Sequence, residues 1–262
     1  MTEVLGRHET QVHWNAQCYD RLQLMAHRLA STAVCVAAAL VWCLSHTTGR
    51  AEQTGSYPSH WWAPVPEDQK AVWEILPQAA KPGQVILSKR NELGILSNFA
   101  ATPFTFRGKR YASLEGFWQM MLYPEGPDDF RAKAAGAAWA HTRNEVAGMT
   151  GFEAKDAGTA AEAIMRKIGI DWVTFEGKRI EYRSSKRAAH YDLIVAGMRA
   201  KMEQNPKVRE ILLATGNLTL LPDHTPEAGA PAEWLYFQVW MEIRRELQSQ
   251  KELPSKKEGS AQ

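Results

Sequence analysis

The chain has 262 residues, 45% of them hydrophobic, which is enough for one domain with a sizeable core and some appended segments. Its formal net charge is only +2, from 31 Lys and Arg against 29 Asp and Glu. This balance excludes a global positive field of the kind that attracts nucleic acid or acidic membranes, and no clear nucleic-acid patch is visible. A polyanionic ligand would therefore need a local basic site.

The first 51 residues are typical of an export segment. A basic stretch precedes an uninterrupted apolar run from Ala33 to Leu44, and Gly49-Arg50-Ala51 then places small residues where a signal peptidase reads them. The run is shorter than the ~20 residues of a membrane span. We therefore expect a cleaved signal peptide and an exported protein, periplasmic or secreted. The alternatives are a signal anchor over residues 29–45, which would be the chain's only link to a membrane, and a buried hydrophobic helix. Met25 is a second candidate for the start.

Cysteine usage and motif absence restrict the chemistry. All three cysteines, Cys18, Cys35 and Cys43, precede Ala51. The exported part would then have no disulfide, no thiol nucleophile and no thiolate metal site. The sequence also lacks the His-rich patterns of zinc enzymes and the Gly-rich loops that hold phosphates. We expect neither a metal nor a cofactor.

Residues 52–84 are expected to form a linker and one short helix. Pro66 is a favourable first residue for that helix, and Pro77 ends it. Three tryptophans are expected to pack this segment on the domain, with a wall for stacking on a ligand as the alternative: Trp61, Trp62 and Trp73.

A hairpin and a short helix follow a first strand over residues 84–88. Extended aromatic runs flank Arg107-Gly108-Lys109, which is typical of a hairpin turn. Ser113 can then cap a helix whose first turn contains Glu115. Glu115 and Gln119 are four residues apart, so they stack on the helix surface. The apolar face of this helix is expected to contain Leu114, Phe117, Trp118 and Met121.

The remaining pattern predicts more helices than strands, and the two types do not alternate along the chain. Helices are expected over residues 128–139, 154–168, 188–204, 206–214 and 234–248, a hairpin over 172–182 and a short strand over 218–221. This order predicts an α+β fold: a predominantly helical single domain over residues 85–247, with a small sheet of short strands and hairpins. Residues 248–262 are rich in Lys, Glu, Ser and Gln and are expected to be a disordered tail.

Two blocks of motifs run through the predicted domain. The first contains Leu96-Ser-Asn-Phe99, Pro103-Phe104, Gly108, Tyr111-x-Ser113-x-Glu115 and Gln119. The second contains Gly197-Met-Arg-Ala-Lys201-Met-Glu-Gln-Asn-Pro206, followed by Ile211-Leu-Leu-Ala-Thr-Gly216. In order and spacing they resemble the NADAR family (NAD and ADP-ribose associated, also called YbiA-like) over roughly residues 85–247. The resemblance implies a YbiA-like fold and cleavage of N-glycosidic bonds, either of phosphoribosylated riboflavin-pathway intermediates or of ADP-ribosylated bases.

Such cleavage develops positive charge on the sugar and negative charge on the leaving base, so it needs a carboxylate and a proton donor or hydrogen bonds to the base. The resemblance implies that Glu115 is the catalytic carboxylate, which activates water or steadies the oxocarbenium ion. From the residues alone, Glu115 would be a helix-start carboxylate that complements the dipole. Asp223 lies where family members carry an acidic residue, and His224 beside it is a candidate proton donor; a surface loop is the alternative.

Seven residues are candidates for ligand binding: Ser97, Asn98, Phe99, Trp118, Gln119, Lys201 and His224. Asn98 and Gln119 would bind ribose hydroxyls or the base edge, unless Asn98 only closes a turn. Phe99 and Trp118 would stack on the base, although Trp118 also fits the core. Lys201 follows a basic cluster and would clamp a phosphate, with a solvated charge as the alternative.

The expected function is a NADAR-like hydrolase that cleaves an N-glycosidic bond of a phosphoribosylated or ADP-ribosylated base. Its partner would be a small nucleotide-like or ADP-ribose-type ligand. The alternatives are a non-catalytic domain that binds ADP-ribose or a nucleotide, and an envelope interaction protein that retains only the fold. Turnover separates the first from both others, and thermal stabilisation by ligand separates the second from the third.

Overall fold

A computed structural model of the chain describes residues 57–184 and 186–252. The predicted signal segment, the three cysteines and residues 253–262 of the predicted tail lie outside this part. Within it, no helix is both long enough and apolar enough to cross a membrane.

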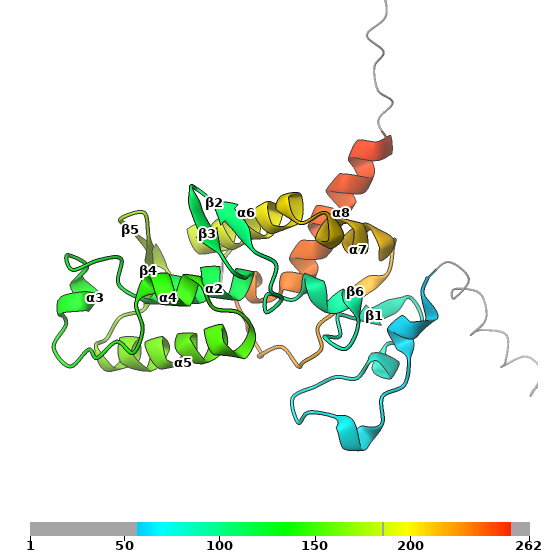
Figure 1. Ribbon diagram of the computed structural model, residues 1–262, viewed down its shortest axis with the longest axis horizontal. Helices are drawn as coiled ribbons and strands as arrows, with labels where there is room; N and C mark the ends of the chain where they lie inside the picture. The colour runs from blue at the N-terminus through cyan, green and yellow to red at the C-terminus, as the bar shows by residue number, and fades with distance from the viewer. Residues whose placement is uncertain (1–56, 185, 253–262) are drawn as a thin grey trace, which may run out of the picture. The chain divides into compact units, whose positions relative to one another are not determined.

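The described chain has an α+β fold in which helices predominate, as the sequence predicts. The α-helices are α2 (Leu114–Gln119), α3 (Phe130–Lys133), α4 (Arg143–Ala147), α5 (Gly151–Lys167), α6 (Ala189–Gln204), α7 (Pro206–Ala214) and α8 (Tyr236–Glu252). The strands form two-stranded pairs instead of one small sheet: β1 (Gln84–Ile86) with β6 (Thr219–Leu221), β2 (Phe104–Phe106) with β3 (Lys109–Tyr111), and β4 (Trp172–Phe175) with β5 (Lys178–Glu181). Helix α2 lies between α5 and α6 (Figure 1), at the centre of the hydrophobic core.

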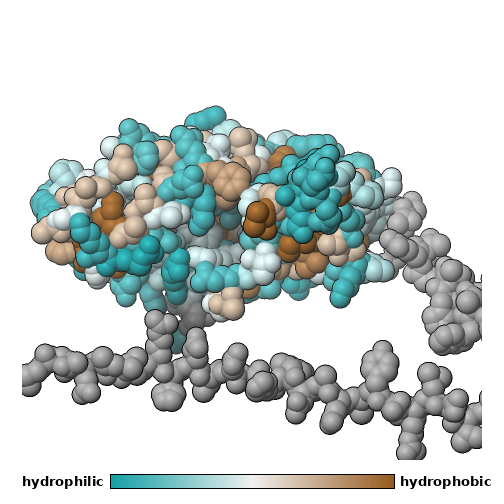
Figure 2. Space-filling view, turned by 90° about the horizontal axis from the view of Figure 1, so that it is seen from below, coloured by the Kyte–Doolittle hydropathy of each residue, from teal (hydrophilic) through white to brown (hydrophobic). Residues whose placement is uncertain are grey.

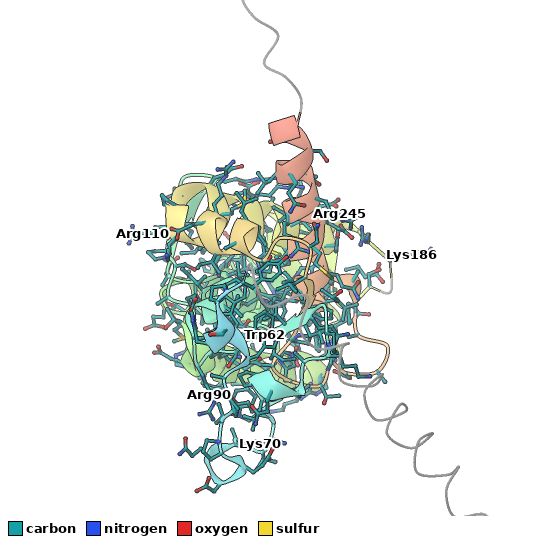
Figure 3. The ribbon with its side chains drawn as sticks, turned by 90° about the vertical axis from the view of Figure 1, so that its right-hand side faces the viewer. Trp62, Lys70, Arg90, Arg110, Lys186 and Arg245 are labelled. Carbon is teal, nitrogen blue, oxygen red and sulfur yellow. The ribbon has the colours of Figure 1, made fainter. Side chains whose placement is uncertain are left out.

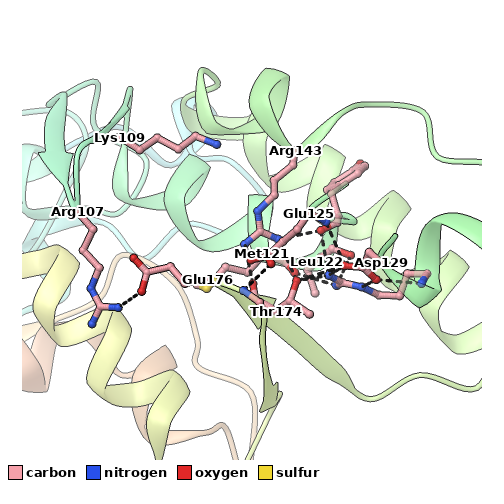
Figure 4. A network of polar contacts seen from close by, with 12 residues as sticks. Arg107, Lys109, Met121, Leu122, Glu125, Asp129, Arg143, Thr174 and Glu176 are labelled. Carbon is pink, nitrogen blue, oxygen red and sulfur yellow. Dashed lines mark hydrogen bonds and ion pairs between the residues drawn. The ribbon is translucent and has the colours of Figure 1, made fainter. Parts of the chain in front are cut away.

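The two predicted hairpins are confirmed. Phe104 pairs with Tyr111 in the first, and Trp172 pairs with Glu181 in the second. Both turns have positive φ at their two central residues, as a two-residue type I′ turn requires, and each has Gly at the second of them. An ion pair between Arg107 and Glu176 joins the two turns (Figure 4), so the tips of the hairpins lie together.

Helix α2 is buried on every side, more deeply than its single predicted apolar face suggests. Ser113 caps it as predicted, because its Oγ accepts a hydrogen bond from the Gly116 amide at 2.9 Å and donates one to the Met149 carbonyl at 2.9 Å. A Cβ at Gly116 would lie 2.6 Å from that carbonyl oxygen, so only glycine permits this close approach. Burial includes the two polar side chains of the helix, Glu115 and Gln119. Burying a carboxylate costs free energy, so a buried Glu on α2 indicates a functional site at this helix.

The helix predicted over residues 128–139 is wrong in its length. Asp129 caps it as expected, by accepting from the Arg131 amide at 2.9 Å, but α3 ends at Lys133 and Ala134 is already extended. The Arg131 guanidinium is fully buried and donates to three carbonyl oxygens beyond the end of α2 (Figure 4), those of Met121, Leu122 and Tyr123. A helix end leaves such carbonyls without partners of its own. Satisfying them holds Arg131 in place and directs the chain away from a longer helix.

Helix α4 is not among the predicted helices, although its capping signal is present in the sequence. Thr142 accepts a hydrogen bond from the Glu145 amide, and the Glu145 carboxylate accepts one from the Thr142 amide. This is a capping box, which the T-R-N-E run at residues 142–145 encodes. The short helix packs against α2 and completes one wall of the core.

The segment before β1 packs on the core through two of its three tryptophans. Trp61, in the 3-10 turn η1 (Ser59–Trp62), is fully buried, and the Trp62 Nε1 donates to the Gln84 carbonyl at 2.9 Å. This confirms the packing predicted for both residues. Trp73 differs, because 43% of it is exposed.

The helix predicted between Pro66 and Pro77 is also wrong. The chain makes one 3-10 turn, η2 (Glu67–Gln69), and then a non-helical turn. The Glu74 carboxylate folds back to accept from the Ala71 amide at 3.3 Å, and Arg90 binds the Gln69 carbonyl at 2.6 Å. These side-chain contacts replace the backbone hydrogen bonds that a helix would make.

Candidate functional site

A cavity of about 520 Å³ opens beside α2, within the size range of small-molecule sites. Most of the predicted site residues line it: Ser97, Asn98, Phe99, Glu115, Trp118, Gln119 and His224. Two predicted residues, Asp223 and Lys201, lie behind its surface. The structure therefore gathers residues from the Ser97–Phe99 loop, from α2 and from the segment after β6 around one space.

Glu115 contributes a buried carboxyl group to this cavity. Its backbone and its side chain are each held by one hydrogen bond: the Glu115 backbone amide donates to the Asn98 carbonyl at 2.9 Å, and the Gln119 Nε2 donates to the Glu115 Oε1 at 2.7 Å. Burial raises the pKa of the Glu115 carboxyl, against the opposing effects of the Gln119 hydrogen bond and of the positive charges on Lys155 and Lys89. The environment thus favours the protonated form of the carboxyl more than water does, which is the direction that a proton donor needs.

Gln119 is held by close packing as well as by its hydrogen bond. Its Oε1 lies against Gly158 of α5, where a Cβ would approach that oxygen to 1.9 Å. The glycine therefore makes room for the amide that orients Glu115.

Several buried polar atoms around the cavity have no hydrogen-bond partner within residues 57–184 and 186–252. They include Asn98 Oδ1, Trp234 Nε1 and the Tyr236 hydroxyl. Burial and, to a smaller extent, the negative charge of Asp223 raise the pKa of Tyr236, so its hydroxyl keeps its proton. These atoms include both donors and acceptors, the two kinds of group that sugar hydroxyls and base edges would need as partners.

Asp223 acts behind the cavity surface and not within it. Its side chain is fully buried, accepts from Lys89 Nζ at 2.6 Å and contacts His224 Nδ1 at 3.2 Å. Burial alone would raise the pKa of the Asp223 carboxyl, but the hydrogen bonds from His224 and Lys89 and the Lys89 charge outweigh it, and the pKa is lowered. An ionised Asp223 favours the His224 tautomer with a proton on Nδ1, which leaves Nε2 free. The sequence predicts that Asp223 acts directly in catalysis. Its buried position instead fits a residue that positions Lys89 and His224.

Lys201 does not line the cavity, contrary to the predicted phosphate clamp. It is fully buried in α6, and its Nζ donates to the Ser97 carbonyl at 2.8 Å. Burial lowers the pKa of Lys201 to about 7. Periodicity places a lysine on a helix face but does not show that this face meets the core. Lys201 supports the Ser97–Phe99 loop from behind and has no access to a ligand.

The basic cluster before α6 is also engaged elsewhere. Arg183 pairs with Glu162 and lies 4.6 Å from the Trp234 ring centre, while Arg187 pairs with Glu242. The lysines that line the cavity are Lys89 and Lys155 instead, and neither is among the predicted site residues.

Other lining residues that sequence reasoning missed include Val72, Phe152, Tyr182, Thr225, Trp234 and Tyr236. Most of them are apolar or aromatic and belong to no chemical motif. Trp73 also lines the cavity, which is the position that the alternative of a ligand-stacking wall requires. For the others, only the fold brings them to the site.

No family model and no curated protein matches the chain. Among solved structures, it is similar to the NMR structure of the E. coli protein YbiA, with a TM-score of 0.38 and 20% sequence identity over 65% of this chain and 92% of that chain. A likeness at this level carries no function from that protein to this chain. Membership of the NADAR family remains a prediction from the two motif blocks.

Proposed function

We propose that the chain is a hydrolase that cleaves the N-glycosidic bond of a phosphoribosylated or ADP-ribosylated base. The observation that carries this proposal is the buried Glu115 carboxyl, oriented by Gln119 and exposed to a cavity with aromatic walls and unpartnered polar atoms. The resemblance to a family of N-glycosidases adds the reaction class.

The two acidic residues differ in environment, and this difference divides the work between them. Glu115, whose pKa is raised, donates a proton to the leaving base as the bond to the sugar breaks. Asp223, whose pKa is lowered, holds His224 so that its Nε2 takes a proton from the attacking water. Hydroxyl groups of the ribose bind the free acceptor of Asn98 and the donors of Trp234 and Tyr236. Lys155, on the rim, faces the phosphate.

The test is the Glu115→Gln variant, assayed by chromatography for release of free base from a phosphoribosylated pyrimidine and from an ADP-ribosylated base. We expect turnover to fall roughly 10²- to 10⁴-fold, the usual contribution of a positioned acid–base group, while binding is kept. The matched control is Glu153→Gln, which removes an exposed carboxylate of the first turn of α5 that does not line the cavity. Equal turnover of the Glu115→Gln protein and the unaltered protein would rule out the catalytic role.

The pH profile separates proton donation from base catalysis by Glu115. A donor must be protonated, so kcat falls as pH rises through its pKa, whereas a base gives the opposite limb. If the unaltered protein binds these ligands and releases no base, it is a non-catalytic domain that binds ADP-ribose or a nucleotide.

A further inference from the structure

Exposed apolar side chains gather at the mouth of the cavity. In residues 57–184 and 186–252, the large hydrophobic side chains that are most exposed are Val72, Trp73, Phe130 and Phe152. All but Phe130 line the cavity. On the one face that Figure 2 shows, the hydrophobic areas are separate from one another. Exposed apolar groups that meet at a cavity mark a binding surface.

The turn that presents Trp73 is firmly held. The buried Glu74 carboxylate accepts two hydrogen bonds from Arg90, at 2.6 Å and 2.7 Å, and Arg90 also donates to the Gln69 carbonyl. The Ile75 amide donates to the Asp223 carbonyl at 2.7 Å. Figure 3 shows Arg90 where the turn that carries Lys70 joins the rest of the structure. Because these hydrogen bonds hold the turn, the exposure of Trp73 is a fixed feature of the fold and does not result from local unfolding.

Three rings form an angled wall at this point. The Trp73 and Phe152 ring centres are 5.9 Å apart with planes at 61°, and the Phe99 and Phe152 centres are 5.1 Å apart at 80°. Lys89 Nζ lies 5.0 Å from the Trp73 ring centre and 5.2 Å from that of Phe99. The wall therefore combines flat apolar faces with a cation beside them, which suits a planar ring that carries or adjoins negative charge.

We propose that Trp73 and Phe152 form a subsite for a nucleobase ring of a nucleotide ligand, with the phosphate of that nucleotide on Lys155. The ligand class rests on the proposed function, but the subsite is a binding site and does not depend on cleavage. Trp73 supplies a ring face from the turn before β1, and Phe152, in edge-to-face contact with it, adjoins that face from the first turn of α5. The substrate thus presents a planar ring to the mouth of the cavity while its sugar lies deeper, near Asn98.

Isothermal titration calorimetry with AMP, UMP and ribose 5-phosphate tests this subsite. We expect the unaltered protein to bind both nucleotides more tightly than ribose 5-phosphate, which has no base. Trp73→Ala and Phe152→Ala should each reduce this advantage, by roughly 5- to 100-fold, the range for loss of one base-stacking ring. Phe130→Ala, which removes an exposed ring outside the cavity, is the matched control and should change nothing.

Three results would overturn the proposal. In the first, the unaltered protein binds AMP no more tightly than ribose 5-phosphate, or binds neither. In the second, the Trp73 and Phe152 variants lose affinity for both ligands equally. In the third, sedimentation shows a change of oligomeric state on Trp73→Ala with no change in AMP affinity, which identifies the patch as a contact with a second copy. Ring-dependent binding without base release would refute the hydrolase and leave the subsite standing.

Discussion

Replacing Lys201 by methionine should abolish a rise in stability between pH 7 and pH 9. Lys201 is buried in α6, and its ammonium donates a hydrogen bond to the Ser97 carbonyl. Burial lowers its pKa to about 7 in the folded protein, whereas an unfolded lysine keeps a pKa of about 10.4. Between these values the unfolded chain binds a proton that the folded chain has released. The free energy of unfolding must therefore rise with pH across this window.

The magnitude follows from the two pKa values. Below pH 7 both states are protonated, and the folded protein carries the full cost of a buried charge. From pH 7 to pH 9 the difference in bound protons approaches one, and integration gives a gain of about 2 kcal/mol in the free energy of unfolding. Methionine has a similar length and no charge, so the variant lacks this slope. Its stability at any single pH also includes the lost hydrogen bond to Ser97, which is why the slope is the informative quantity.

Urea unfolding at pH 7, 8 and 9 measures the slope for both proteins. Other titrating groups contribute equally to each and cancel in the difference. Lys207→Met is the matched control, because Lys207 is exposed on α7 and pairs with Glu210 on the same helix. If the Lys201→Met and unaltered proteins gain stability in parallel between pH 7 and pH 9, the buried lysine does not titrate in this range and the reasoning is refuted.

Two further outcomes are expected. Gly158→Ala places a Cβ 1.9 Å from Gln119 Oε1 and should displace that amide, so base release should fall at least tenfold while the melting temperature drops by only a few degrees; an unchanged rate would show that Gln119 does not orient Glu115. If the segment before Ala51 is a signal peptide, N-terminal sequencing of the native protein should begin near Glu52. Recovery of a chain that retains Cys35 would contradict export with cleavage.

The local signals of the sequence predict much of the fold. Gly108 and Gly177 mark the two hairpin turns, Ser113 marks the start of α2, and the long helices follow from periodicity. The Ser97–Phe99 loop and the two polar residues of α2 do meet at the cavity, as the motif spacing indicates.

The failures share one cause, which is that a sequence pattern does not show what lies opposite a residue. Lys201 sits on a regular helix, but only the fold shows that its face meets the Ser97 carbonyl in the core. Arg131 lies in a helix that ends two residues later, and its donors bind carbonyl groups of another segment. Trp73 lines the cavity because Arg90 and Asp223, distant in sequence, hold its turn. Each of these outcomes depends on a contact with residues that lie outside the short stretch of sequence from which the prediction is made.

The parallel pairing of β1 with β6 has a consequence for the order in which the molecule assembles. Its register joins Gln84 to Thr219, so this contact closes a loop that contains most of the other elements. Closing such a long loop costs conformational entropy, which is offset only when many contacts form together. Non-local pairings of this kind therefore slow folding. Asp223 follows β6 directly and meets both Lys89 and the turn that carries Trp73. A chain still emerging from the ribosome or from a translocation pore therefore has no complete cavity until β6 has arrived, and the binding site belongs to the last stage of folding.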